Sequence, residues 1–260
     1  MRFDNYEFRC SDLGKIMSNK GDLTQSNKTY LTEVFICEKN GIRKEISSKF
    51  LEKGNLTEQD GLTLLNKAIY PNNLLIKNTE RRHNGWIHGE ADCIAPDDII
   101  YDIKNAWDKI SFGKADLTTD YYWQLVGYMW LWGKNKARLF YCLNNMPEVL
   151  LIDEERKLFY ANHFVTYEDP EYQKLCEEMR AKHNYDDMKL EERFKVWDVE
   201  HSDEEIGKLK TKILKCRKFL NDLYEKEMER IKYNRSLMGL PDVIIAEHDK
   251  EVNATIVDGI

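Results

Sequence analysis

Residues 86–107 have the sequence WIHGEADCIAPDDIIYDIKNAW, and this stretch decides the fold that we expect. Two apolar runs flank a turn made of Ala, Pro and two Asp residues: Trp86-Ile87 with residues 91–94 form the first, and residues 99–101 with Ile103 form the second. Proline fixes φ in such turns and Asp can hydrogen-bond its own backbone, so the pattern predicts two antiparallel strands joined by a turn. That hairpin would bring Asp92 and Asp102 near each other at one end.

Lys104 follows Asp102 by two residues, so both side chains are expected on the same face of the second strand. Two carboxylates and one ammonium group at a strand end suit a hard divalent cation, which prefers oxygen ligands. The ammonium group could then orient a water molecule or stabilise a developing negative charge. Alternating Asp and Lys is also common on a solvated strand, so the triplet alone does not identify a catalytic site.

Composition and charge limit the classes of protein to consider. The 260 residues include 42% hydrophobic and 12% aromatic residues, enough for one large domain or a domain with a helical appendage. The formal net charge of -7 argues against a surface that coats nucleic acid, but it leaves room for a local basic groove. The six Cys residues form no C-x-x-C pair, so we expect free thiols in a reducing cytoplasm rather than zinc or an iron–sulfur cluster. The sequence shows no signal-peptide core and no membrane-spanning apolar run, which predicts a soluble protein without a membrane partner.

Helical patterns flank the hairpin in the sequence. They cover residues 11–18, 29–38, 50–70 and 117–132. Ser11 is the expected N-cap of the first helix, whose N-terminus could bind a phosphate or could simply begin the helix. The fourth helix would carry Gln124 and Tyr128 one turn apart.

Glu58 lies between two glycines, Gly54 and Gly61, in the helical pattern of residues 50–70. Glycine inside a helix costs about 1 kcal/mol relative to alanine. The two glycines therefore predict close packing or the close approach of another backbone. Glu58 is either a third acid that faces a metal site or part of a solvated helix face.

Further strands are expected at residues 74–81 and 137–143, with a short edge strand at residues 148–152. Asn84-Gly85 is a strong turn signal, so residues 74–81 would join the two hairpin strands in a three-stranded meander. The order helix, three strands, helix, strand predicts an α/β fold with a central mixed sheet and helices on both faces.

The C-terminal part of the sequence predicts a helical extension. A helix is expected to begin near Glu171, after Pro170. Residues 202–233 form one long helical pattern, with a capping box at its start and an apolar seam at heptad-like spacing. Its basic face is either solvated or in contact with nucleic acid, and the seam could pack on a partner helix or a second subunit. Residues 243–245 are expected to form a strand or a tail.

Several motifs occur in an order that resembles the PD-(D/E)XK nuclease superfamily, in particular phage lambda exonuclease and the YqaJ-like recombinase nucleases. The matching motifs are the early Ser11 helix, Gly54-x-x-x-Glu58, Gly89-Glu90-Ala91-Asp92, Asp102-x-Lys104 and Tyr122-x-Gln124-x-x-x-Tyr128-x-Trp130. Ala91 stands where the family often has proline, and Asp102 stands where glutamate is commoner. The resemblance implies a restriction-endonuclease-like nuclease core over residues 1–153 and a helical extension over residues 154–260.

The resemblance also implies a role for each motif residue. The implied catalytic residues are Glu58, Asp92, Asp102, Lys104 and Gln124. The implied ligands of Mg²⁺ or Mn²⁺ are Asp92, Asp102, Glu58 and the carbonyl oxygen of Ile103. The implied nucleic-acid-binding residues are Arg9, Ser11, Lys15 and Tyr128. Tyr128 could instead pack beneath Gln124.

The activity implied by the resemblance is metal-dependent DNA exonuclease activity, running 5′→3′ on linear duplex DNA, in phage-type recombination or DNA processing. Nucleases of this kind can form ring-like oligomers and work with a single-strand annealing protein. A homo-oligomer and such a partner are therefore expected, in the host cytoplasm if the protein is phage-encoded.

Two alternatives remain open at the level of sequence. One is an endonuclease or an RNA-directed nuclease on the same PD-(D/E)XK fold. The other is a non-catalytic module on this fold that binds nucleic acid or protein. Cas4-type relatives, which hold an iron–sulfur cluster, are disfavoured by the scattered Cys residues.

Overall fold

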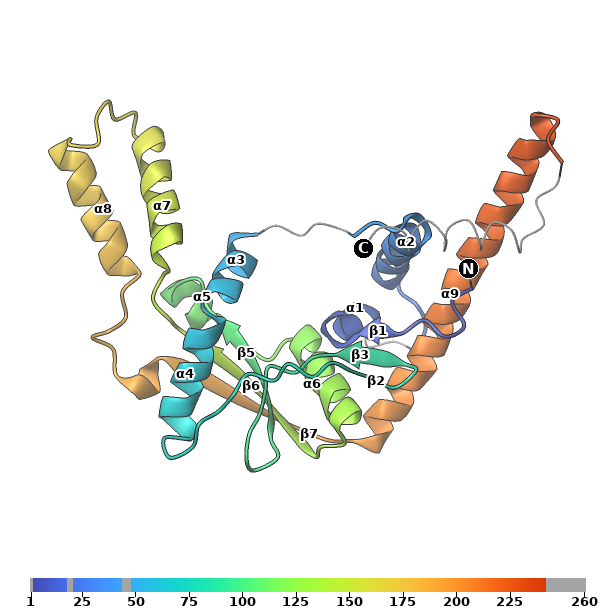
Figure 1. Cartoon of the computed structure of the whole chain (residues 1–260), viewed down its shortest axis with the longest axis horizontal. Helices are drawn as coiled ribbons and strands as arrows, with labels where there is room; N and C mark the ends of the chain where they lie inside the picture. The colour runs from blue at the N-terminus through green and yellow to red at the C-terminus, as the bar shows by residue number, and fades with distance from the viewer. Residues whose placement is uncertain (1, 18–20, 44–47, 242–260) are drawn as a thin grey trace. The chain divides into compact units, whose positions relative to one another are not determined.

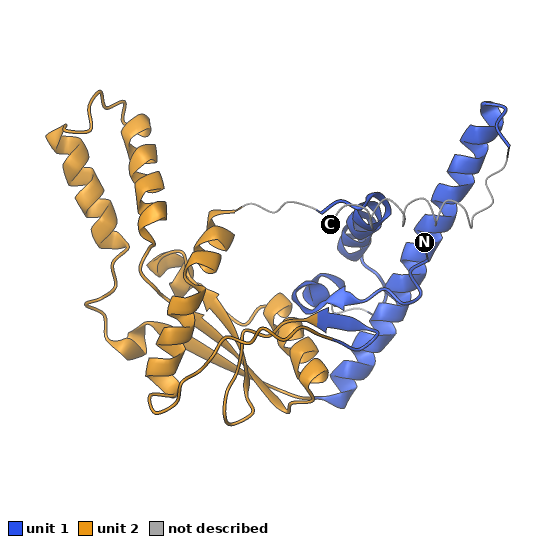
Figure 2. Cartoon of the chain, viewed as in Figure 1, with its two compact units in different colours: residues 1–45, 83–88, 202–260 blue, residues 46–82, 89–201 orange. Residues whose placement is uncertain are grey.

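The structure is a computed structural model that describes residues 2–17, 21–43 and 48–241 (Figure 1). The chain forms two compact units (Figure 2). Unit 1 is drawn from residues 1–45, 83–88 and 202–260, and unit 2 from residues 46–82 and 89–201. These units are compact bodies and do not correspond to the predicted nuclease core and helical extension. The predicted boundary near residue 153 therefore stays a prediction.

Unit 2 is built on a four-stranded mixed sheet with the order β4-β5-β6-β7. The strands are β4 (Cys93–Ile94), β5 (Ile100–Asn105), β6 (Lys136–Cys142) and β7 (Phe194–Glu200). β4 and β5 form the predicted antiparallel hairpin, in which Cys93 lies opposite Tyr101. β5 and β6 are parallel, and α6 (Thr119–Trp132) provides the crossover that parallel strands require. The predicted central mixed sheet is confirmed.

Helices cover both faces of this sheet. α4 (Glu58–Ile69) packs on β5 and β6, and α6 packs on β5, β6 and β7. Successive side chains of β5 point to opposite faces. Ile103 lies against Gly61 of α4, whereas Asp102 accepts a hydrogen bond from Gln124 of α6. The two helices therefore lie on opposite faces, as expected for the α/β core.

An apolar core fills the space between α4 and the sheet. Its buried residues include Leu62, Leu65, Tyr101, Ile103 and Phe140. Unit 2 also contains α3 (Lys49–Leu56), α5 (Lys109–Gly113) and the 3-10 helix η2 (Leu190–Glu192). Its α7 (Glu148–Ala161) and α8 (Pro170–Lys182) form a helical hairpin (Figure 1). The helix predicted to begin near Glu171 is confirmed; it begins at Pro170, and Asp169 caps it.

The expected strand at residues 74–81 is wrong, and so is the three-stranded meander. Leu75 is buried between the exposed Leu74 and Ile76, which imitates the alternation of a strand. The Leu75 amide, however, donates to the side chain of Asn66 rather than to a neighbouring strand. The segment is therefore irregular until β2 begins at its end.

Two other predictions about unit 2 are corrected. Residues 148–152 begin α7 instead of forming an edge strand, because a short apolar run does not distinguish a strand from a buried helix face. Residues 50–70 form two helices, α3 and α4, which meet at Thr57.

Unit 1 combines helices with a small sheet, of which all residues except Arg82 and Gly89 belong to this unit. The sheet has the order β1-β3-β2, from β1 (Phe8–Arg9), β3 (Ile87–Gly89) and β2 (Arg82–His83). The helices are the 3-10 helix η1 (Cys10–Asp12), α1 (Leu13–Ile16), α2 (Gln25–Asn40) and α9 (Asp203–Leu237). The turn at Asn84-Gly85 is confirmed, since Gly85 has a φ of 80°. Ser11 is not an N-cap, because it lies inside η1 and Asp12 precedes α1.

α9 confirms the predicted long helix. Ser202 is its N-cap and accepts a hydrogen bond from the backbone of Glu205 at 3.3 Å. The helix packs on α2, and its apolar seam is buried at Leu209, Ile213, Cys216 and Leu220. This part of the seam is used inside unit 1. No helix among the described residues is both long and apolar enough to cross a membrane. Residues 243–245 lie outside the described residues.

Gly61 determines how closely α4 approaches β5. A Cβ atom at this position would lie 2.7 Å from Ile103 Cγ2 and 3.2 Å from Asn105 Nδ2. We therefore expect Gly61→Ala to lower the free energy of unfolding by about 1–3 kcal/mol, the usual cost of overpacking a core. Urea unfolding followed by tryptophan fluorescence measures the change.

Gly54→Ala in α3 is the matched control, because a Cβ atom there would meet no atom within 4 Å. Alanine at this position should raise the free energy of unfolding by up to about 1 kcal/mol. If the two variants were equally stable, the close contact between α4 and β5 would be refuted.

Candidate active site

The end of the β4–β5 hairpin brings together the two aspartates of the predicted site. The pairing of Cys93 with Tyr101 places Asp92 opposite Asp102 in the antiparallel register. Asp92 Oδ2 also accepts a hydrogen bond of 2.6 Å from the backbone amide of Ile103. The expected juxtaposition of Asp92 and Asp102 is present.

Lys104 pairs with the fully buried carboxylate of Asp102. Its Nζ donates a hydrogen bond of 2.9 Å to Asp102 Oδ1. Asp102 Oδ2 lies 2.8 Å from the same nitrogen, but not in hydrogen-bonding geometry. Among the described residues, Oδ2 has no hydrogen-bond donor although it is buried. A buried carboxylate oxygen without a donor is costly unless a cation or water molecule binds it.

α6 fixes the orientation of Asp102 from the other side. Gln124 Nε2 donates to Asp102 Oδ1 at 3.0 Å and to the hydroxyl oxygen of Tyr128 at 2.9 Å. Both α6 side chains are buried, and they lie one turn apart as the sequence predicted. The burial of Tyr128 favours packing beneath Gln124 over contact with nucleic acid.

The ammonium group of Lys104 is held between negative charge and an aromatic ring. Burial lowers its pKa, but the carboxylates of Asp102 and Asp92 outweigh this effect and raise the pKa above the usual value. The nitrogen also lies 5.6 Å from the centre of the Tyr121 ring, within the range of a cation–π interaction. Lys104 is therefore a fixed positive charge at neutral pH and not a general base.

The pKa of Asp92 is strongly perturbed. Burial and the charge of Asp102 together raise it to about 7, against the opposing effects of Lys104 and the Ile103 amide. Two carboxylates thus share one ammonium group. A divalent cation at this position would favour the ionised form of both acids.

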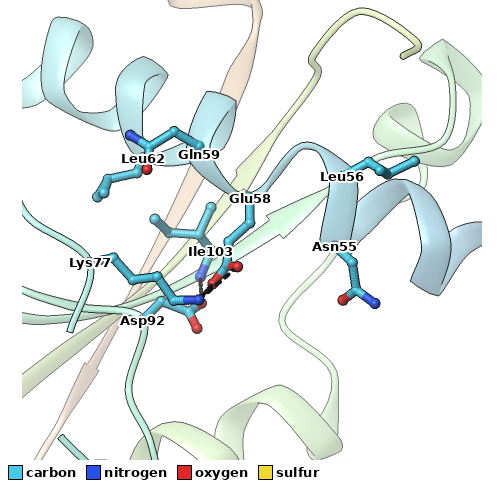
Figure 3. Close-up of a pocket in the computed structure, with 8 residues that line it drawn as sticks. All are labelled: Asn55, Leu56, Glu58, Gln59, Leu62, Lys77, Asp92 and Ile103. Atoms are coloured by element: carbon cyan, nitrogen blue, oxygen red, sulfur yellow. Dashed lines mark hydrogen bonds and ion pairs between the residues drawn. The ribbon is translucent and has the colours of Figure 1, made fainter. Parts of the chain in front are cut away.

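Glu58 lies at the edge of the same site, in the first turn of α4. It lines a pocket of about 140 Å³ together with Asp92, Ile103 and Lys77 (Figure 3). Its two carboxylate oxygens lie 2.8 Å and 2.9 Å from the Nζ of Lys77. No group of three or more His, Cys, Asp or Glu side chains is placed to hold a metal within the part of the chain that the structure describes. Glu58 therefore faces the pocket, but it is engaged by Lys77.

The donor set nevertheless fits a hard divalent cation. Asp102 Oδ2 has no hydrogen-bond donor among the described residues, the pKa of Asp92 is raised by burial and by the Asp102 charge, and both acids lie beside Ile103, whose carbonyl is the third expected ligand. All three donors are oxygen atoms, as Mg²⁺ and Mn²⁺ prefer.

The residues expected to bind a nucleic-acid phosphate belong to unit 1. Arg9 is exposed in β1, and Ser11 is exposed in η1. Lys15 donates a hydrogen bond of 2.6 Å to Asp12. Their assignment to nucleic-acid binding stays a prediction.

Sequence reasoning missed two residues of the site, Lys77 and Tyr121. Lys77 lies in the irregular segment that the alternating pattern predicted as a strand. The spacing of residues in this segment therefore did not indicate that Lys77 approaches Glu58. Tyr121 precedes Gln124 by about one helical turn on α6, and this spacing could have indicated that both side chains lie on the same side of the helix.

Comparisons with known proteins identify the fold. No family model matches the chain, and no curated protein sequence does. A phage-related exonuclease from Haemophilus somnus 129PT has a similar structure, with a TM-score of 0.66 and 23% identity over 85% of this chain and 96% of that chain. The alkaline exonuclease LHK-Exo from Laribacter hongkongensis has a TM-score of 0.55 and 13% identity, over 89% of this chain and 94% of that chain. A second structure of LHK-Exo, in complex with dAMP, gives a TM-score of 0.54. The chain has the fold of these exonucleases, which confirms the fold implied by the sequence motifs.

Asp92→Asn tests how much the buried carboxylate of Asp92, placed beside Asp102, lowers the free energy of unfolding. The pKa of Asp92 is about 7 in the folded protein and near 4 in an unfolded chain. The folded state thus binds more protons between these values, and its free energy of unfolding should fall as pH rises from about 4 to 7.

The measurement is urea unfolding in EDTA across this pH range. Asp92→Asn should flatten the slope and should exceed the stability of the wild-type protein at pH 8, by on the order of 2 kcal/mol. The control is Asp187→Asn, which alters an exposed acid and should keep the wild-type slope. If Asp92→Asn kept the wild-type slope, the pKa of Asp92 would not be raised in the folded protein.

Proposed function

We propose that the protein is a Mg²⁺- or Mn²⁺-dependent deoxyribonuclease that hydrolyses phosphodiester bonds as an exonuclease. The observation that supports this most strongly is the environment of Asp102. Its carboxylate is buried, held by Lys104 and Gln124, and leaves one oxygen without a hydrogen-bond donor among the described residues, beside a second acid. Such an arrangement suits a cation next to a phosphate group.

The roles of the residues follow from their contacts. Asp102 Oδ2, Asp92 and the Ile103 carbonyl would hold the ion. The bound ion would supply stabilisation of charge on the scissile phosphate and a lower pKa for the attacking water. Lys104 keeps its positive charge close to these oxygens, where it orients the water or stabilises the additional negative charge of the transition state.

Gln124 acts through Asp102 and is a positioning residue. Its amide donates to Asp102 Oδ1, so that Oδ2 would remain available to hold the ion. Tyr128 accepts the second hydrogen bond of this amide and fixes its rotamer. Glu58 would contribute a further carboxylate from α4 once its pairing with Lys77 is released.

The substrate and the reaction polarity are part of the proposal. Two solved proteins of similar structure are exonucleases, and one of them was crystallised with dAMP, which supports DNA as the substrate here. The motif resemblance supports 5′→3′ degradation of linear duplex DNA, a homo-oligomer, and a single-strand annealing protein as partner. A non-catalytic binding module is less well supported, because buried charges cost stability and such a module has no use for them.

DNA degradation tests the proposal directly. We expect the purified protein to degrade linear duplex DNA with Mg²⁺ or Mn²⁺ and to leave it intact in EDTA. Asp102→Asn and Lys104→Ala should each lower the rate by about 100-fold or more, because each removes a charge that stabilises the transition state. Gel electrophoresis of end-labelled DNA measures rate and polarity together.

Circular duplex DNA and the Asp187→Asn variant are the controls. Circles should survive, and Asp187→Asn should retain the wild-type rate. Equal cutting of circles would identify an endonuclease instead. Wild-type rates in folded Asp102→Asn and Lys104→Ala proteins would refute the assigned site.

A further inference from the structure

Lys77 is the cation that faces the candidate metal site from the irregular segment between α4 and β2. Its Nζ lies 2.8 Å from one carboxylate oxygen of Glu58 and 2.9 Å from the other. Figure 3 shows its side chain extending over Asp92 to reach Glu58. The ammonium group thus lies between two oxygens of one carboxylate, in the manner of a bound cation.

We propose that Lys77 is a tethered cation that occupies the Glu58 side of this site, so that a second divalent ion binds there only when Lys77 moves away. The inference rests on the proposed metal-dependent function and adds a determinant of its metal stoichiometry. The ammonium group of Lys77 and the second divalent ion compete for the carboxylate of Glu58.

The charges of the site support this competition. Three carboxylates, Glu58, Asp92 and Asp102, face two ammonium groups, Lys77 and Lys104, which leaves one net negative charge when all are ionised. One divalent ion at the two aspartates already reverses this sign. A second divalent ion is then repelled unless the charge of Lys77 leaves the pocket.

Loss of its proton does not release Lys77 from Glu58 at neutral pH. Its pKa is raised by the hydrogen bond to Glu58 and by the charges of Glu58, Glu90 and Asp92, which together outweigh the lowering by burial. The side chain therefore leaves as an ammonium group. It is partly exposed, with 45% of its surface accessible, so it can exchange Glu58 for solvent without unpacking the core.

The backbone on both sides of Lys77 is held in place, which confines the movement to the side chain. The Leu75 amide donates to Asn66 Oδ1 at 2.9 Å. The Asn78 amide donates to the Asp92 carbonyl at 2.8 Å, and the Asn78 side chain donates to the Ala91 carbonyl at 2.9 Å. These bonds keep the base of the lysine beside Asp92, so the ammonium group returns to Glu58 whenever no other cation holds this carboxylate.

Mn²⁺ binding to the full-length protein tests this inference without any measurement of activity. Free Mn²⁺ is followed by electron paramagnetic resonance at low ionic strength and pH 8. We expect the wild-type protein to bind one ion well and a second ion weakly. Lys77→Met should bind the second ion at least about tenfold more tightly, because a unit charge adjacent to the ion is removed.

Lys67→Met is the matched control. Lys67 is exposed near the end of α4 and lines a different pocket, so its removal changes the net charge equally without opening Glu58. It should bind Mn²⁺ as the wild-type protein does. Adding Glu58→Gln to Lys77→Met should remove the gain in affinity for the second ion.

Failure of this inference is distinguishable from failure of the proposed function. If the first ion binds, Asp102→Asn abolishes it, and Lys77→Met matches Lys67→Met at the second ion, then Lys77 is not a competitor and the nuclease proposal stands. If no variant binds Mn²⁺, and Asp102→Asn equals the wild-type protein, then both proposals are refuted.

Discussion

The burial of one carboxylate, that of Asp102, is the constraint on which the rest of the site depends. A buried charge is unfavourable unless it is paired and hydrogen-bonded. Lys104 supplies the charge from the same strand, and Gln124 supplies the hydrogen bond from α6. The helix that makes the parallel crossover between β5 and β6 is therefore also the helix that orients the acid. Fold and site are linked at this residue.

Successive side chains of β5 point to opposite faces of the sheet, so one face carries the charged residues of the site and the other packs against a helix. Asp102 and Lys104 face α6, and Ile103 between them faces α4, where Gly61 permits a close approach. This approach brings the first turn of α4, and with it Glu58, to the pocket above Asp92. A glycine in a helix, which lowers helix stability, thus places an acidic residue beside the proposed metal site.

The hairpin, the crossover helix and the pairing of Asp102 with Lys104 could be predicted from the sequence, because each depends on local spacing. Turn chemistry fixes the hairpin register, and a separation of two residues fixes the face of a strand. The course of residues 74–81 could not be predicted, because the buried Leu75 imitates a strand while its amide bonds to a side chain. Lys77 was missed for the same reason. β7 was also missed: it completes the sheet from far along the sequence, and its burial is partial along most of its length, which leaves a weak alternating pattern.

The central claim is that Asp92, Asp102 and the Ile103 carbonyl form one cation site. Anomalous X-ray scattering from crystals of the protein grown with Mn²⁺ tests it most directly. Our account predicts a manganese peak at coordination distance from Asp102 Oδ2 and from oxygens of the other two residues, with Lys104 still beside Asp102. A well-ordered site with no manganese peak, or a peak bound only by other residues, would contradict it.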